Sequence, residues 1–205
     1  MRCNANISFN YQREKPEYYY HVRKYLLTIK NVITKKAITV SMESKSWKDS
    51  FAELERIVLP TDTNPINDLY GGRLVEWIDN VASITAARHS RRRNVTGSID
   101  SLFFLSPIHL GDIVHLTSRL NYVTRSTMEV EVDVYAEDSL TGDKKFTTTC
   151  FLTYVAITQD GKPTEVPSLA LDDEDTIRRF NEGKKRSEAR LINLQEAKKK
   201  VPKEI

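Results

Sequence analysis

The sequence predicts an α+β fold in which an antiparallel sheet wraps around one long central helix, followed by a charged helix at the C-terminal end. The stretch from Arg73 to Arg88 repeats apolar residues at helical spacing on nearly every side, which is typical of a buried helix. One strand-like stretch precedes this helix and four follow it. One helix and five strands cannot cover both faces of a sheet, so the simplest arrangement curls the sheet around the helix.

The strands are predicted from apolar residues that alternate with polar ones and from the turns that bound them. The expected strands cover residues 51–59, 94–105, 113–123, 128–137 and 144–157, with a turn at residues 140–143. In the fourth strand, apolar positions alternate with acidic ones such as Glu129 and Glu131. This pattern predicts one buried face and one solvent-exposed face.

Composition and charge divide the chain into three parts. Residues 1–41 hold eight basic and two acidic residues without a clear period, so we treat them as a basic N-terminal extension. They loosely resemble a transit peptide, but we favour the alternative that the protein starts at Met42. Residues 42–171 form the expected domain. Residues 172–205 form a charged helical tail, with a helix over 172–200 whose sparse apolar residues predict loose packing on the domain or on a partner subunit.

Several classes of function are excluded by composition. Residues 42–171 hold 13 basic and 18 acidic residues, which argues against a nucleic-acid-binding surface. No apolar run approaches the about 20 residues that span a bilayer, and no secretory segment is visible, so we expect a cytoplasmic protein without a membrane partner. Cys3 and Cys150 match no metal or redox spacing, so Cys150 is expected to be a buried thiol and no metal site is predicted.

The predicted central helix carries a carboxylate, Asp79, among apolar neighbours. Because burying an unpaired charge is costly, Asp79 either faces a polar seam or is a functional carboxylate whose site sets its orientation. Gly71 and Gly72 are expected just before the helix, where they leave the first backbone N–H groups uncovered. These donors and the helix dipole suit an oxygen that gains negative charge, which favours the functional interpretation.

Seven short segments between residues 52 and 169 occur in the order and spacing of one known family. They are Leu59–Asn64, Gly71–Asp79, Ala86–His89, Val95–Asp100, Pro107–Asp112, Arg125–Val130 and Thr153–Ala156. Together they resemble the hotdog-fold acyl-CoA thioesterases, the family of bacterial broad-range and cytosolic brain-type acyl-CoA hydrolases. The chain departs from that family at Asn67, where a glycine is usual. Because asparagine tolerates left-handed backbone conformations, we expect the turn to survive.

The resemblance implies hydrolysis of fatty acyl-CoA to free acid and coenzyme A. It implies no metal, and no separate cofactor because coenzyme A is part of the substrate. It also implies a homodimer with active sites at the subunit interface, and hexamers built as trimers of dimers. Asp79 of one subunit would act as the general base for water or as the nucleophile, and Asn64 of the other would orient water or substrate. The backbone N–H of Gly72 would hold the developing oxyanion.

Further residues are candidates for contacts with the substrate. Gly71 belongs to the same pair as Gly72. Arg88, His89 and Arg91 crowd the end of the predicted helix, either as favourable charge there or as a basic mouth for the phosphates of coenzyme A.

Two segments outside the central helix carry other candidates. Ser126 and Thr127 either donate hydroxyl groups to the coenzyme A arm or only start a strand. Asp100, which lies near a turn, is expected to accept backbone hydrogen bonds.

Two alternatives use related folds. A non-catalytic hotdog module would bind acyl-CoA as a sensor, but it would not need both Asn64 and Asp79. A hotdog dehydratase usually relies on a catalytic histidine near the start of the helix, and this helix begins without one.

Overall fold

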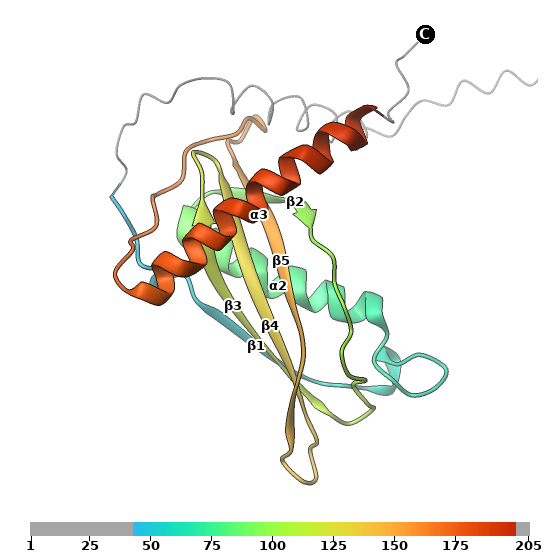
Figure 1. Cartoon of the computed structure of the whole chain (residues 1–205). Helices are drawn as coiled ribbons and strands as arrows, with labels where there is room; N and C mark the ends of the chain where they lie inside the picture. Colours follow the sequence, from blue (N-terminus) through green and yellow to red (C-terminus); the bar gives the residue numbers. More distant parts are fainter. Residues whose placement is uncertain (1–42, 200–205) are drawn as a thin grey trace, which may run out of the picture. The chain divides into compact units, whose positions relative to one another are not determined.

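A computed structural model describes residues 43–199 of the chain (Figure 1). The predicted N-terminal extension and the alternative start at Met42 lie outside the described residues. The elements are η1 (Trp47–Asp49), β1 (Ala52–Ile57), η2 (Pro60–Asp62), α2 (Gly71–Ser90), β2 (Arg93–Ile99), β3 (Ile113–Val123), β4 (Thr127–Glu137), β5 (Lys144–Ile157) and α3 (Glu174–Lys199). This order confirms the predicted succession of one strand, a long helix, four strands and a C-terminal helix.

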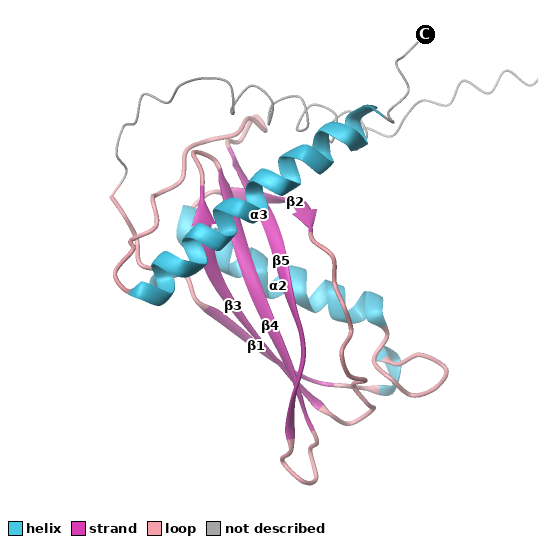
Figure 2. Cartoon of the chain, in the orientation of Figure 1, coloured by secondary structure: helices cyan, strands magenta, loops and turns pink. Residues whose placement is uncertain are grey.

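The five strands form one antiparallel sheet with the order β1-β3-β4-β5-β2, so β1 and β2 are its edges (Figure 2). The sheet curls around α2, as predicted. Leu74, Ile78 and Val81 of α2 are at most 1% exposed and pack on apolar side chains of the strands. Burial of this apolar face contributes most of the stability of the domain.

The helix α2 is not buried on every side within one subunit, contrary to the sequence prediction. Glu76 and Asn80 are exposed, and Ile84 is 39% exposed. Apolar periodicity describes how much surface a helix tends to bury, and it does not say which part of that surface the same chain covers. The uncovered side of α2 is therefore available to another subunit.

Two predicted strands have the expected bounds, β1 and β4 differ from them by one or two residues at an end, and β2 is much shorter than predicted. The bounds of β3 and β5 match the prediction, whereas β2 ends at Ile99 instead of continuing to Leu105. A bulge interrupts the pairing of β2 with β5 between Thr96 and Ser98. After Asp100, whose N–H donates to Phe151 O at 2.9 Å, the chain leaves the sheet edge.

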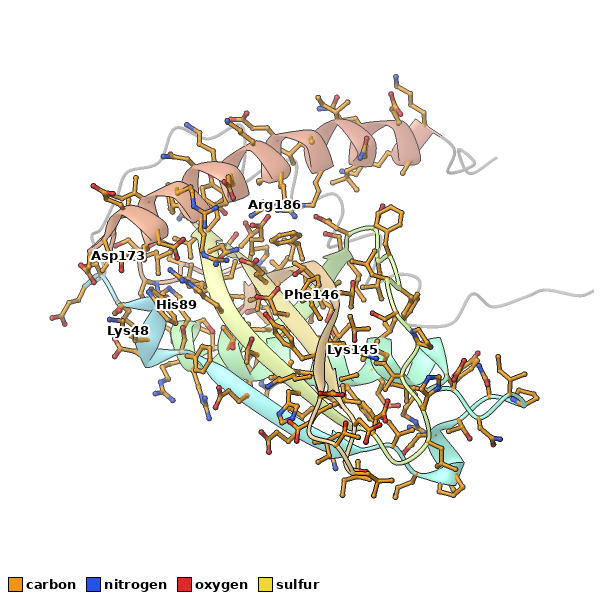
Figure 3. The ribbon with its side chains drawn as sticks, turned by 60° about the horizontal axis from the view of Figure 1, so that its bottom comes forward. Lys48, His89, Lys145, Phe146, Asp173 and Arg186 are labelled. Carbon is orange, nitrogen blue, oxygen red and sulfur yellow. The ribbon has the colours of Figure 1, made fainter. Side chains whose placement is uncertain are left out.

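The helix α3 lies across the face of the sheet opposite α2 (Figure 1). This position corrects the prediction that the acidic face of β4 is solvent-exposed. The Glu129 side chain is only 1% exposed and accepts hydrogen bonds from Arg186 and Arg190 of α3. Figure 3 shows Arg186 on the side of α3 that faces the sheet. The buried charge of Glu129 is thus paired, as burial of a charge requires.

The packing of α3 is close, which corrects the prediction of a loosely packed tail. Gly183 meets the sheet so closely that a Cβ added there would lie 2.7 Å from both Glu129 Oε1 and Tyr122 Cβ. The rings of Phe180 and Tyr122 contact each other edge to face at 4.9 Å between centroids. At the start of the helix, Arg119 of β3 pairs with Asp175. Ion pairs, an aromatic contact and a close glycine contact thus hold α3 on the sheet, although its apolar residues are sparse.

Two smaller predictions concern residues outside these contacts. Cys150 lies in the core with no exposed surface, as predicted, and burial raises the pKa of its thiol to about 11. No helix within residues 43–199 is long and apolar enough to cross a membrane.

Candidate active site

The loop before α2 is shaped by the side chain of Asn64. Its Oδ1 accepts the backbone N–H groups of Ile66 at 3.0 Å and Asp68 at 3.1 Å. Asn67 adopts a left-handed conformation with φ 63°, which confirms that asparagine sustains the turn here. Because Oδ1 is committed to two donors, the side-chain amide must present Nδ2 elsewhere. Nδ2 has no acceptor within residues 43–199, so Asn64 can offer a donor to a ligand.

The glycine pair forms the first two residues of α2 rather than preceding it, which corrects the predicted start of the helix at Arg73. The N–H groups of Arg73 and Leu74 donate to Tyr70 O at 2.8 and 3.1 Å. The N–H groups of Gly71 and Gly72 have no acceptor among the described residues. The uncovered donors that the sequence predicted are therefore present, because the first turn of any helix leaves its N–H groups without partners.

A cavity of about 310 Å³ opens beside this helix start. Its lining residues are Asn64, Asp68, Leu69, Gly71, Leu74, Phe104, Leu105, Ser106, Pro107 and Ile108. Most of these side chains are apolar, and two of the three polar ones, Asn64 and Asp68, belong to the loop before α2. Such a cavity suits a ligand with an apolar part and one polar group to be oriented.

The carboxylate of Asp79 is held by two hydroxyl groups. Its Oδ1 accepts hydrogen bonds from Tyr154 of β5 at 2.7 Å and from Thr96 of β2 at 2.9 Å. Tyr154 is 1% exposed, and burial followed by the neighbouring Asp79 carboxylate raises its pKa above the ordinary value. The phenol therefore stays protonated and donates. Asp79 Oδ2 has no donor within the described residues, so one oxygen of the carboxylate is left for a ligand or water.

Sequence reasoning assigned no role to Thr96 or Tyr154. Both belong to segments that carry the family resemblance, and both are polar residues inside predicted strands. That position was the available signal, but it did not show which way either side chain points. The fold brings them to Asp79 from 17 and 75 residues away in the chain.

Asp79 and Asn64 do not share one cavity within a subunit. Asp79 is absent from the lining of the cavity that contains Asn64 and Gly71. It lies seven residues beyond Gly72, which places its backbone about 10 Å further along the helix axis. One subunit thus presents two separate groups of polar residues, one at the start of α2 and one around Asp79, near the middle of the helix.

Among the substrate-binding candidates at the end of α2, His89 is contradicted by the structure. Its side chain is 0% exposed, and Nε2 lies 2.9 Å from Pro167 O. Desolvation lowers the pKa of His89, which keeps the ring neutral. Arg88 donates to Phe51 O, and Arg91 ends the helix with φ 51°. Both arginines are exposed and remain available to a ligand.

The hydroxyl candidates lie at the turn between β3 and β4. Ser126 is 3% exposed, and its carbonyl accepts the N–H of Ala156. The hydroxyl of Thr127 lies 2.6 Å from that of Thr124. These contacts match the structural alternative, in which the two residues start a strand. No group of three or more His, Cys, Asp or Glu residues in the described part of the chain is placed to hold a metal.

Comparison with known proteins identifies the family. Residues 66–142 match the model of the thioesterase superfamily. The chain is 43% identical over 148 residues to YkhA of Bacillus subtilis, which is named an uncharacterized acyl-CoA thioester hydrolase, and the match covers 72% of this chain and 86% of YkhA. The chain belongs to the acyl-CoA thioester hydrolases. It is also 35% identical to the cytosolic acyl coenzyme A thioester hydrolase of Rattus norvegicus, of which it spans about a third, 36%.

Solved structures of this family share the hotdog fold of the chain. The acyl-CoA hydrolase of Bacillus cereus superimposes with a TM-score of 0.73 at 36% identity, over 77% of this chain and 96% of that one. The acyl-CoA hydrolase of Staphylococcus aureus, solved with butyryl coenzyme A and coenzyme A, gives a TM-score of 0.72 at 34% identity, over 77% and 96%. For the Staphylococcus aureus hydrolase, structures also exist of alanine variants at an asparagine, an aspartate and a threonine.

Proposed function

We propose that this hydrolase cleaves fatty acyl-CoA to free acid and coenzyme A, with Asp79 as the general base for water and with Asn64 and Gly72 as oxyanion donors. The observation that carries the proposal is the Asp79 carboxylate, held on one oxygen by Tyr154 and Thr96 and free on the other. A base needs a fixed position within hydrogen-bond reach of the attacking water. Two neutral donors on Oδ1 supply the position, and Oδ2 faces the water.

The proposed reaction needs few other groups from the protein. Water attacks the thioester carbonyl carbon and transfers a proton to Asp79 while the carbonyl oxygen becomes negative. The carbon–sulfur bond then breaks, and coenzyme A leaves as a thiolate. A thiol with a pKa of about 8.5 is a good leaving group near neutral pH, so little acid assistance is required. The main contribution left to the protein is stabilisation of the oxyanion.

Asn64 is proposed to donate to the oxyanion rather than to accept from water. Its Oδ1 is engaged by two backbone N–H groups of its own loop, which leaves Nδ2 as its only free polar atom. Together with the N–H of Gly72, Nδ2 would form a pair of donors. Removing one such donor costs about 10²- to 10³-fold in kcat.

Relatives support placing these residues in one site. In the Staphylococcus aureus hydrolase, the three residues replaced by alanine are an asparagine at position 28, an aspartate at position 43 and a threonine at position 60. They are separated by 15 and 17 residues. Asn64, Asp79 and Thr96 have the same types and the same separations. The match supports a role for Thr96 beside Asp79 that the family resemblance alone had not suggested.

The site is proposed to be completed across a homodimer, so that Asp79 of one subunit faces Asn64 and Gly72 of the other. Within one subunit these residues lie apart, and Phe103 and Leu105 beside the cavity are 70% and 67% exposed. Large exposed apolar side chains of this kind are typical of an interface. A relative is described as a hexameric acyl-CoA thioesterase, which supports a trimer of dimers.

A phosphate-binding surface and a cellular location complete the proposal. Arg91, with its neighbours Arg92 and Arg93, is exposed and has no carboxylate partner within residues 43–199, which suits binding of the coenzyme A phosphates. A cytoplasmic location is proposed because the rat relative is named cytosolic.

The proposal is tested by thiol release from a panel of acyl-CoAs, short to long, with wild type beside Asp79→Asn and Asn64→Asp. Asn64→Asp keeps the acceptor that shapes the loop and replaces the donor by a negatively charged oxygen that would repel the oxyanion, so the variant should fold and lose at least about 10²-fold in kcat. Asp79→Asn should be inactive and folded. Wild-type turnover by Asp79→Asn would refute the assigned base. Tight acyl-CoA binding without hydrolysis by the wild type would favour the sensor.

Two further experiments resolve the mechanism and the shared site. A single turnover in ¹⁸O-labelled water puts the label in the product if Asp79 is the base. If the carboxylate is the nucleophile, it forms a mixed anhydride with the acyl group and releases the thiolate, and attack of water on the Asp79 carbonyl of that anhydride leaves the label in Asp79. Label in Asp79 would therefore refute the base. Co-expression of Asn64→Asp and Asp79→Asn subunits in equal amounts should restore about a quarter of wild-type activity, because half of the dimers then contain one intact site. No recovery would show that each site belongs to a single subunit.

A further inference from the structure

The segment between β2 and β3 forms one wall of the cavity. This wall segment, residues 100–108, has no regular secondary structure. Five of its residues, Phe104 to Ile108, make up half of the cavity lining. The position of the wall segment therefore sets the shape of this cavity, whose apolar lining suits the acyl chain of the proposed substrate.

Hydrogen bonds fix the wall segment at its two ends, and between them Leu102 packs against the core. At the downstream end, Leu105 N donates to Thr147 O at 3.1 Å, and Ile108 O accepts from Leu69 N at 2.7 Å. At the upstream end, Asp100 N donates to Phe151 O, and the Asp100 carboxylate accepts from Arg190 Nη1 at 2.8 Å. Residues 101–104 make no hydrogen bond to other described residues. The contacts of Asp100 with Phe151 and Arg190 thus determine where the stretch without hydrogen bonds, residues 101–104, begins.

Arg190 belongs to α3, on the far face of the sheet, and its guanidinium is fixed from two sides. One branch binds Asp100, and the other binds Glu129, a carboxylate that is 1% exposed. Arg190 itself is 17% exposed, so this is not a surface ion pair of little value. A planar guanidinium that forms two such bonds is restricted in both position and orientation.

We infer that Arg190 is a positioning residue for the substrate cavity: by holding Asp100 against α3, it fixes the wall segment and thereby tunes which acyl chains fit. This inference rests on the proposed hydrolysis of acyl-CoA. The coupling runs through one contiguous path, from α3 through two ionic contacts to the chain that lines the cavity. Arg190 does not touch the reacting atoms, so its effect should fall on recognition of the acyl chain and not on the chemical step.

The chain offers a matched control. Arg190→Gln and Asp100→Asn both remove the ion pair between α3 and the wall segment. Arg186→Gln also removes one of the two guanidinium groups on Glu129, but Arg186 does not contact Asp100. Loss of Glu129 pairing is therefore shared by the two arginine variants, whereas loss of the hold on Asp100 is shared by Arg190→Gln and Asp100→Asn.

The experiment measures kcat and KM across a panel of acyl-CoAs from acetyl to palmitoyl. For long chains, Arg190→Gln and Asp100→Asn should each raise KM about fivefold, which corresponds to about 1 kcal/mol. For acetyl-CoA, kcat should stay within about twofold of wild type. The double variant should be no worse than either single one, because both remove the same contact. Arg186→Gln should keep the wild-type chain-length profile.

Wild-type profiles in Arg190→Gln and Asp100→Asn would overturn the inference. An equal change in Arg186→Gln would also overturn it, since it would show a general loosening of α3. Failure of the proposed function looks different, because then the wild type itself releases no thiol. In that case dissociation constants for the same acyl-CoA panel, measured by calorimetry, test the inference directly: the long-chain values should rise in Arg190→Gln and Asp100→Asn alone.

Discussion

The contact of α3 with the sheet can be tested at Gly183, because the helix leaves no room for a larger residue against β3 and β4 there. In an isolated helix, replacing glycine by alanine stabilises by about 1 kcal/mol, since glycine loses more backbone entropy on folding. At position 183 the new Cβ would lie 2.7 Å from Glu129 Oε1 and 2.7 Å from Tyr122 Cβ. Separations below 3.0 Å are not tolerated without movement of the neighbours.

The expected cost of Gly183→Ala exceeds its gain. Overpacking costs about 1–3 kcal/mol, and the displaced carboxylate is the buried Glu129, whose ion pairs with α3 are weakened by any shift. Subtraction of the helix-propensity gain of about 1 kcal/mol leaves a loss of about 0–2 kcal/mol from overpacking. The weakened ion pairs of Glu129 add to it, so we expect a net loss near the upper end, about 2 kcal/mol. For a chain of this size this corresponds to a fall of about 4–8 °C in the melting temperature.

The assay is thermal unfolding followed by circular dichroism, with Asn181→Ala as the control. Asn181 lies on the exposed side of the same helix turn, so alanine there gains propensity without meeting the sheet. Asn181→Ala should leave the melting temperature unchanged or raise it. If Gly183→Ala raised the melting temperature as well, α3 would not pack on the sheet at this contact. The evidence that Arg186 and Arg190 pair with a buried Glu129 would then be weakened.

The remaining predictions concern the site and its pH dependence. Tyr154→Phe removes one of the two hydroxyl donors to Asp79, so kcat should fall about tenfold, the order expected for a hydrogen bond to a charged group, while an unchanged kcat would show that Thr96 alone positions the carboxylate. Burial lowers the pKa of His89 below 6.5, so the unfolded state binds the proton more readily and stability is fully present above pH 6.5 and lost as the pH falls below it. Urea unfolding at pH 7.5 and 5.5 measures this loss, which should be smaller in His89→Gln; an equal loss in both would exclude His89 as its source.

The fold was predictable where the sequence pattern is local. The bounds of β3 and β5 follow from alternation between turns, and a strand that alternates regularly has few other structures available to it. The covering of the acidic face was not predictable in this way, because an acidic row that faces water and one that faces arginines have the same alternation. The available signal was in α3, where Arg179, Gly183, Arg186 and Arg190 recur at helical spacing and form one face.

The candidate site shows the same limit. Asp79 and Gly72 were predicted because their chemistry is unusual in their local setting, a carboxylate in an apolar helix and a glycine pair at its start. Tyr154 could not be identified in this way, since its contact with Asp79 joins positions 75 residues apart. His89 was misassigned because its charge near a helix end was weighed above its place in the buried stripe with Ala82 and Thr85.

The bulge in β2 explains how Thr96 and Asp100 come to point to opposite faces of the sheet. Thr96 points to Asp79 on the side of α2, and in a regular strand Asp100, four residues later, would point to the same side. The register shift between Thr96 and Ser98 inserts one extra residue, which reverses the alternation and turns Asp100 toward Arg190 of α3. Gly97 occupies the bulge, where a Cβ would lie 3.2 Å from Thr153 O. The contact that orients the Asp79 carboxylate and the contact that anchors the cavity wall are thus four residues apart, so the segment from Thr96 to Asp100 links α3 to the candidate site.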